Sequence, residues 1–233
     1  MPIIYPFEHL GKADYGWLKA NYHFSFGEYH NPDKMGFGPL CVWNDDEVNA
    51  GKGFPRHPHK NMEIITYVRE GAITHKDSMG NEGRTEAGSI QIMSAGSGVT
   101  HSEYNLEETE TRLFQIWLRP HTENIEPRWE TAVLEPETQA GFTCLASGVP
   151  GDKAKIEIYQ QARLWRAVGQ KGECLQFSEQ RWGALYGVLS KGRIRISSHE
   201  VNARGGVFIP KEEPVTIEIL ENFEGLFVEI VIS

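Results

Sequence analysis

Two pairs of potential metal ligands stand out in the sequence. His57 and His59 lie in the run from Phe54 to Glu63, and His101 and Glu103 follow further along the chain. In a β-strand, residues i and i+2 project to the same face, so each pair would present two side chains next to each other. We therefore predict that the two pairs share one metal ion.

Three histidines and one carboxylate form a nitrogen-rich set of ligands. Such a set suits first-row divalent metals such as iron, manganese, cobalt, nickel or zinc, whereas calcium and magnesium prefer oxygen. Four protein ligands on a six-coordinate ion leave two positions for water, substrate or dioxygen, so the predicted site is open to chemistry. Four unconnected polar residues are the alternative. Two i,i+2 pairs beside turn residues argue against it, because a shared site requires such spacing.

Glu63 is an alternative source of the carboxylate. Positions 57, 59, 61 and 63 would share one face of an unbroken strand, so spacing alone does not choose between Glu63 and Glu103. The remaining histidines show no comparable pairing, and we assign them to the surface or the core: His9, His23, His30, His75, His121 and His199.

Composition limits the possible functions. The 233 residues are 39% hydrophobic and 24% charged, which is enough to bury a core in one large β domain or two smaller ones. A net charge of −9 lacks the clustered basic residues that phosphate contacts need, so we expect no direct binding to nucleic acid. No apolar segment resembles a signal peptide or a membrane span. Three widely spaced cysteines, Cys41, Cys144 and Cys174, favour reduced thiols and a cytoplasmic location.

Short β-segments must position the candidate ligands. Alternating polarity and turns rich in glycine and proline predict strands rather than helices. In the segment 112–118, Leu113, Gln115 and Trp117 share one face, which makes Gln115 an inward-facing polar candidate. The predicted strands from residue 64 onward cover 64–68, 72–75, 89–93, 112–118, 128–134, 142–146, 155–160, 162–167, 173–177, 183–189, 193–197, 207–209, 215–220 and 226–232.

A weak internal repeat divides the chain into two halves. Residues 67–74 resemble residues 188–195, and each half is predicted to form one β-barrel. The connection between them falls within residues 120–152, which are rich in proline and glycine. The four ligand positions of the first half map onto Ser178, Gln180, Glu218 and Leu220 in the second. The second half therefore cannot build the same site.

These motifs resemble the cupin superfamily and, within it, the pirin family. Two stretches are similar to the first cupin motif and to the end of the second: Gly51-x5-His57-x-His59-x3-Glu63 and Gly98-x2-His101-x3-Asn105. Segments similar to pirins span residues 24–26, 44–46, 53–59, 93–96, 101–103 and 115–117. The specific part of the resemblance covers residues 14–130, and the remainder of the chain is similar only in architecture.

The resemblance implies an all-β bicupin, in which two antiparallel jelly-roll barrels lie face to face. A metal-binding domain would cover residues 1–135, and a C-terminal domain without the metal ligands would cover residues 136–233. The resemblance also implies that His57, His59, His101 and Glu103 hold the metal, with Glu63 in a supporting or core position. Iron(II) is the metal we expect, and manganese, cobalt, nickel, zinc and copper are alternatives.

The activity implied by this resemblance is that of a quercetin 2,3-dioxygenase, which opens the flavonol C ring and releases carbon monoxide. The metal would bind the flavonol 3-hydroxyl or its oxyanion and lower its pKa, with dioxygen entering beside it. Glu103 would take the proton. Candidates for an apolar wall around the substrate, each of which also suits the core, are Phe24, Phe26, Phe37, Met93 and Trp117.

Two other functions remain open. Pirins also serve as metal-containing regulators that bind a protein partner, and nothing in the acidic composition excludes this role. A cupin enzyme that acts on an unrelated enol is the second alternative. A regulator should tolerate Glu103→Gln as long as the metal stays bound, whereas the dioxygenase should not.

Overall fold

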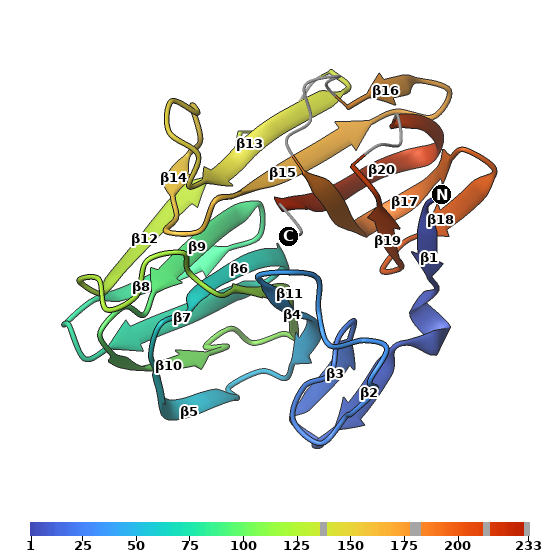
Figure 1. Ribbon diagram of the computed structural model, residues 1–233. Coiled ribbons are helices and arrows are strands. Elements are labelled where there is room, and N and C mark those ends of the chain that lie inside the picture. Colours follow the sequence, from blue (N-terminus) through green and yellow to red (C-terminus); the bar gives the residue numbers. More distant parts are fainter. Residues whose placement is uncertain (136–138, 178–182, 212–214, 231–233) are drawn as a thin grey trace. The chain divides into compact units, whose positions relative to one another are not determined.

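The computed structural model describes residues 1–135, 139–177, 183–211 and 215–230. These residues form strands, apart from loops and the short 3-10 helix η1 (Phe7–His9). No helix within the described ranges is both long and apolar enough to cross a membrane. The chain divides into two compact units (Figure 1). We call Gly11–Glu135 with Ile158–Gln160 the N-terminal unit, and Met1–Leu10, Pro136–Glu157 and Gln161–Ser233 the C-terminal unit.

Two antiparallel sheets form the N-terminal unit. Its strands are β2 (Gly11–Asp14), β3 (Leu18–Tyr22), β4 (Leu40–Val48), β5 (Gly53–His59), β6 (Glu63–Glu70), β7 (Ala72–Asp77), β8 (Glu82–Glu86), β9 (Ser89–Ser94), β10 (Val99–Tyr104), β11 (Thr111–Leu118) and β12 (Arg128–Val133). The larger sheet has seven strands in the order β12-β9-β6-β11-β4-β3-β2, and the smaller has four in the order β5-β10-β7-β8.

Polar and apolar rows alternate across the larger sheet. An apolar row runs through β4, β11, β6 and β9 and consists of Trp43, Ile116, Ile65 and Ile92, each at most 1% exposed. The next row, one residue along each strand, is polar and consists of Asn44, Gln115, Thr66 and Gln91. Successive residues of a strand point to opposite faces, so the polar row occupies one face and the apolar row the other.

One nine-stranded sheet forms the C-terminal unit (Figure 1). Its strands are β1 (Ile3–Tyr5), β13 (Gly141–Ser147), β14 (Ile156–Glu157), β15 (Ala162–Gly169), β16 (Cys174–Gln176), β17 (Ala184–Ile196), β18 (His199–Asn202), β19 (Gly206–Ile209) and β20 (Thr216–Ile230). All pairs are antiparallel except β13 with β14. Its core includes Leu185, Ile194, Val207, Ile217 and Phe227. The cysteines of both units are free thiols.

The all-β prediction is confirmed, and the strand boundaries differ mainly at two places. The predicted strands 183–189 and 193–197 form the single strand β17, because the chain bends through register shifts between Leu189 and Ile194 without leaving the sheet. The predicted strands 215–220 and 226–232 likewise fuse into β20, and residues 231–232 lie outside the described ranges. Only Ile156–Glu157 of the predicted strand 155–160 is extended in a sheet.

The predicted domain limits, 1–135 and 136–233, share the boundary after residue 135 with the two units and differ from them in two short segments. Residues 1–10 belong to the C-terminal unit, since β1 pairs with β19 (Figure 1). Residues 158–160 belong to the N-terminal unit, where the backbone N–H of Tyr159 donates to the Glu63 carboxylate. Long-range pairing of this kind leaves no mark in the local sequence.

The internal repeat corresponds to a shared backbone feature. Gly71 and Gly192, on which the two halves align, have φ values of 75° and 81°. Ser178 and Gln180 lie outside the described residues. Glu218 is exposed on β20, where it accepts a hydrogen bond of 3.1 Å from Arg195. Its side chain therefore meets solvent rather than the interior of the unit.

Gly53 allows β5 to approach β10 closely. It lies opposite Tyr104, and a Cβ atom at this position would lie 2.5 Å from the Tyr104 Cα and would also meet the Glu103 carbonyl oxygen. A β-bulge follows, since the register shifts between His101 and Glu103 of β10. The absent side chain therefore sets the spacing of the two strands that carry the predicted ligands.

We predict that Gly53→Ala destabilises the protein by about 3 kcal/mol, because the new methyl group overlaps the β10 backbone. Gly51→Ala is the matched control. Gly51 has a φ of 67°, but a Cβ atom there would meet nothing within 4 Å, so only backbone strain of about 1 kcal/mol is expected. Urea denaturation of both variants measures the difference. Equal destabilisation of the two variants would show that the close approach of β5 and β10 does not require a glycine at position 53.

Candidate metal centre

Strands β5 and β10 bring the three predicted histidines together. His57 and His101 are direct cross-strand neighbours, and their ring centroids are 4.5 Å apart. The His59 ring lies 4.7 Å from that of His57 and 4.9 Å from that of His101. One ring nitrogen from each of the three residues lies within 4.8 Å of the other two. The pairing predicted from the i,i+2 spacing is thus present in the smaller sheet.

A backbone contact fixes the tautomer of His57. Its Nδ1 lies 2.7 Å from the carbonyl oxygen of Pro55. A carbonyl oxygen only accepts hydrogen bonds, so Nδ1 must carry the proton. In the neutral ring the lone pair then lies on Nε2, which points at His101.

A chain of hydrogen bonds fixes the tautomer of His101. His75 Nε2 lies 3.1 Å from Asp77 Oδ2, and the carboxylate accepts, so Nε2 carries the proton of His75. Burial lowers the pKa of His75, which favours the neutral ring and makes its Nδ1 an acceptor. His101 Nδ1, at 3.4 Å, must therefore donate to His75. The lone pair of His101 is left on Nε2.

These assignments place two lone pairs opposite each other. His57 Nε2 and His101 Nε2 are 3.1 Å apart, and neither can donate to the other. Two nitrogens bound to one ion at about 2.0–2.1 Å, at right angles, would be about 3 Å apart. Within the described residues His59 Nε2 is buried without a hydrogen-bond partner. The three nitrogens therefore fit a divalent metal ion.

Burial keeps two of these rings neutral, as metal ligands must be. It lowers the pKa of His101 to about 2, and the neighbouring histidines add to the effect. Burial, followed by the influence of His57, lowers the pKa of His59 to about 4. Lone pairs are thus available on both rings at neutral pH.

Glu103 extends from β10 toward the polar row of the larger sheet. Its carboxylate is 2% exposed and accepts hydrogen bonds from Gln91 Nε2 and Gln115 Nε2, both at 2.6 Å, and from the Thr66 hydroxyl at 3.3 Å. Burial raises its pKa to about 7, against the opposing effect of these donors. The prediction that Gln115 faces inward is confirmed, and its function here is to hold Glu103.

The two carboxylates considered for the site have different surroundings. A Glu103 oxygen lies within 4.8 Å of ring nitrogens of His101 and His75. Glu63 instead accepts hydrogen bonds from Ser94 at 2.8 Å and from Tyr159 at 3.2 Å. The strand does not continue from His59 to Glu63, because β5 ends and Asn61 adopts a φ of 49° before β6 begins. The face-sharing argument for Glu63 is therefore wrong.

A cavity of about 300 Å³ adjoins the cluster. Its volume lies at the lower end of the range for small-molecule sites, about 300–1,000 Å³. Both His57 and Glu103 reach its wall. The other lining residues are Leu18, Ala20, Tyr22, Phe26, Asn44, Asp46, Phe54, Pro55, Arg56, Gln115 and Trp117.

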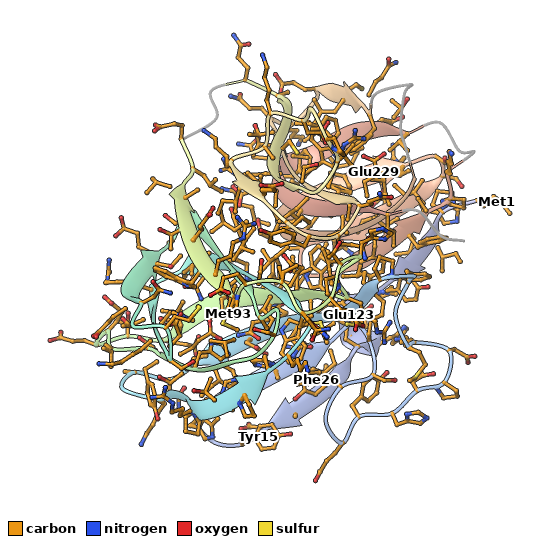
Figure 2. The ribbon with its side chains drawn as sticks, turned by 60° about the vertical axis from the view of Figure 1, so that its left-hand side comes forward. Met1, Tyr15, Phe26, Met93, Glu123 and Glu229 are labelled. Atoms are coloured by element: carbon orange, nitrogen blue, oxygen red, sulfur yellow. The ribbon has the colours of Figure 1, made fainter. Side chains whose placement is uncertain are left out.

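The predicted apolar wall is only partly correct. Phe26, labelled in Figure 2, and Trp117 line the cavity, and their rings meet edge to face at 5.5 Å. Phe24 is buried against Phe37, and Met93 packs with Ile64 in a separate cluster. None of these three lines the cavity described above. Their other predicted role, in packing, is the one that the structure supports.

His75 is the residue that sequence reasoning missed. It is fully buried, its ring stacks on Trp129 at 4.9 Å, and it orients His101. The available signal was its i,i+2 spacing from Asp77, which resembles the spacing of the ligand pairs. The other histidines outside the ligand pairs lie on the surface or in the core, as predicted: His9, His23, His30, His121 and His199.

Comparisons with known proteins agree with this geometry. The family model Pirin matches residues 6–118, and a model described as quercetinase C-terminal cupin domain matches residues 145–230. A pirin-like protein of Caulobacter vibrioides is 46% identical over 225 residues, covering 96% of this chain and 97% of its own. The quercetin 2,3-dioxygenase of Escherichia coli K12 is 36% identical over 221 residues, covering 94% of each chain.

A solved structure gives the same result. The bacterial pirin YhhW of Escherichia coli, in complex with nickel(II), superposes with a TM-score of 0.93 at 35% identity and covers all of both chains. Similarity over nearly the whole length includes both the strands that carry the histidines and the second unit. The chain therefore belongs to the pirin family and has its two-domain cupin architecture.

Proposed function

We propose that the protein is a metal-dependent dioxygenase that opens the C ring of flavonols such as quercetin and releases carbon monoxide. The observation that carries this proposal is the convergence of ring nitrogens of His57, His59 and His101 beside a largely apolar cavity, whose wall includes His57. An open face on a metal ligand cluster suits catalysis, because a purely structural site is closed by its ligands. A relative carrying the name quercetin 2,3-dioxygenase supports the choice of substrate.

His57, His59, His101 and Glu103 would hold the metal. The donor set suits several first-row divalent metals, of which iron(II) is the one we favour. The related pirin in complex with nickel(II) supports a first-row divalent metal at this site. A bound ion would act as a Lewis acid that lowers the pKa of the flavonol 3-hydroxyl, and would offer a position for dioxygen.

Glu103 would accept the proton of the flavonol 3-hydroxyl. Its Oε1 receives two of the hydrogen bonds described above, from Gln91 and Thr66, whereas Oε2 receives one, from Gln115. Oε2 thus keeps more capacity to accept a proton. Burial raises the pKa of the metal-free carboxyl group to about 7, and a bound cation would lower it. The same cation would lower the pKa of the 3-hydroxyl, so that its proton could pass to Glu103.

The aromatic side chains would orient a flat substrate. Phe26 and Trp117 meet edge to face, and Phe54 makes the same kind of contact with Trp17 at 5.3 Å. Rings locked in this way present rigid apolar surfaces, which exclude water from the reacting oxygen. A planar polyphenol matches such walls better than a flexible aliphatic substrate does.

The decisive experiment is anaerobic purification with elemental analysis, followed by oxygen uptake and carbon monoxide release on quercetin. Release of carbon monoxide that depends on the bound metal is the expected result. Metal bound at full occupancy without oxygen consumption would contradict the proposal and favour the regulator that binds a protein partner. Oxygen consumption with other enols but not with quercetin would favour a different substrate.

The first prediction from the proposed function concerns metal binding. His57→Leu and His101→Leu should each reduce the metal content of the purified protein to near zero, because each removes a converging lone pair. His30→Leu, which changes an exposed histidine, is the control and should leave the content unchanged. Metal at about a thousand times its Kd should stabilise the wild type by about 4 kcal/mol. Unchanged metal content in both cluster variants would place the metal elsewhere.

The second prediction concerns the proton. Glu103→Gln should lower kcat/KM for quercetin at least about 100-fold, since general base catalysis contributes about 10²–10⁴-fold. Metal content is measured in parallel, because the new amide would face the Gln91 and Gln115 amides. Glu107→Gln, which removes a surface contact with Arg84, is the matched control and should be fully active. Full activity of a metal-loaded Glu103→Gln protein would argue against Glu103 as the base.

The third prediction concerns His75. His75→Leu removes the acceptor for the His101 N–H and should weaken metal binding about 10–100-fold, as loss of a hydrogen bond to a ligand typically does. Trp129→Phe keeps an aromatic face against His75 and leaves that hydrogen bond intact, so its affinity should match the wild type. Competition with a chromophoric chelator measures both. Equal affinity in His75→Leu and the wild type would refute the orienting role.

A further inference from the structure

Two oxygen atoms in the wall of the cavity lack the partners that buried polar atoms normally have. Asn44 is 4% exposed and Asp46 is 2% exposed, and both line the cavity. In the part of the chain that the structure describes, neither Asn44 Oδ1 nor Asp46 Oδ1 has a hydrogen-bond partner. Buried polar atoms are nearly always paired, so each of these oxygens calls for a partner that the described part of the chain does not supply.

The two residues present their side chains to the same side of β4. They are separated by one residue, and alternate residues of a strand share a face. Asn44 lies between Tyr22 of β3 and Gln115 of β11, and both neighbours also line the cavity. Asp45, which points the other way, receives a hydrogen bond from Arg69. Both side chains thus lie on the face of β4 that borders the cavity.

Neighbouring polar groups do not supply the missing hydrogen bonds. Gln115 uses its amide nitrogen on Glu103 and its amide oxygen on Trp117 Nε1 at 3.2 Å. Glu103 brings negative charge rather than a donor. Burial, followed by the charges of Asp45 and Glu103, raises the pKa of Asp46 well above its usual value, which favours the protonated carboxyl. Asp46 can then both donate and accept.

A hydroxyl group is the chemical partner that fits both positions. It can donate to the Asn44 oxygen, and it can accept from or donate to the Asp46 carboxyl. It would also satisfy Asn44 if the amide were turned around, because it accepts as well as donates. A ligand with a single reacting hydroxyl, engaged near His57 and Glu103, would leave both oxygens unpaired.

We propose that Asn44 and Asp46 determine specificity by binding hydroxyl groups of the ligand, so that the cavity selects planar aromatic molecules with several hydroxyls. This inference rests on the proposed function for the ligand class. A ligand without the additional hydroxyls loses affinity, because its binding leaves buried oxygens without hydrogen bonds. A site that is built to hydrogen-bond a ligand hydroxyl discriminates strongly against an analogue that lacks this hydroxyl.

The test compares two flavonols on the metal-loaded protein. Quercetin carries hydroxyls on both ring systems, and 3-hydroxyflavone carries only the reacting hydroxyl. Anaerobic calorimetry measures binding without turnover. The wild type should bind quercetin at least about tenfold more tightly than 3-hydroxyflavone, the factor expected for one to two neutral hydrogen bonds. Equal affinities would overturn the proposal without any variant.

Variants assign the preference to these residues. Asn44→Leu and Asp46→Leu should each weaken quercetin binding about tenfold and change 3-hydroxyflavone binding less than about twofold. Asp46→Asn retains a donor and an acceptor and should largely restore quercetin binding. Leu18→Ile, which reshapes an apolar part of the same wall, should change both affinities by the same factor. Metal content and melting temperature establish that each variant is folded.

Failure of the inference can be told apart from failure of the proposed function. Carbon monoxide release by the wild type, with both leucine variants keeping the wild-type ratio of affinities, would overturn the inference and leave the dioxygenase intact. Tight, hydroxyl-dependent binding of quercetin without carbon monoxide release would reject the dioxygenase and support the inference. A wild type that binds neither flavonol would overturn both.

Discussion

The candidate metal centre depends on two imidazole lone pairs that face each other and that one bound cation would satisfy. His57 and His101 direct lone pairs at each other across 3.1 Å because their other ring nitrogens are committed to Pro55 and to His75. Asp77 completes the arrangement by accepting from His75 and from the backbone N–H groups of the turn that follows it. Each of these contacts comes from the smaller sheet or its turns. That sheet therefore preorganises the ligands before any metal arrives.

Glu103 comes from the same sheet, where its carboxylate lies near His75 and His101, but its hydrogen-bond donors belong to the larger sheet. Its partners, Gln91, Gln115 and Thr66, are neutral. An arginine in their place would favour the charged carboxylate strongly and lower its pKa by about 1–3 units. Neutral donors instead leave burial as the dominant effect, which gives the pKa of about 7. The polar row thus fixes the position of the carboxylate without sacrificing its basicity.

The sequence predicted what local periodicity can encode and missed what long-range pairing creates. The two ligand pairs follow from the two-residue repeat of a strand, and the inward position of Gln115 follows from the same rule. Glu63 was retained as an alternative because no local signal marked the break at Asn61. His75 became part of the site only through the register of β7 against β10. For the same reason the sequence places residues 1–10 with the first domain, whereas β1 pairs with β19 in the C-terminal unit.

The polar row of the larger sheet contacts both Glu103 and the cavity. Different residues of the row make these two kinds of contact. Gln91, Thr66 and Gln115 donate hydrogen bonds to the Glu103 carboxylate. These three residues therefore influence how readily Glu103 accepts a proton. Asn44 ends this row among the residues that line the cavity, and Asp46 lies two residues further along β4. In the described part of the chain neither Asn44 Oδ1 nor Asp46 Oδ1 has a hydrogen-bond partner. Changes at Gln91 or Gln115 alter the hydrogen bonds to Glu103 directly. Changes at Asn44 or Asp46 act on the cavity wall, and those at Asp46 also act on Glu103 through charge. Substitutions in β4 would therefore change the ligand preference that we propose, while the hydrogen bonds that orient His57 and His101 stay in place.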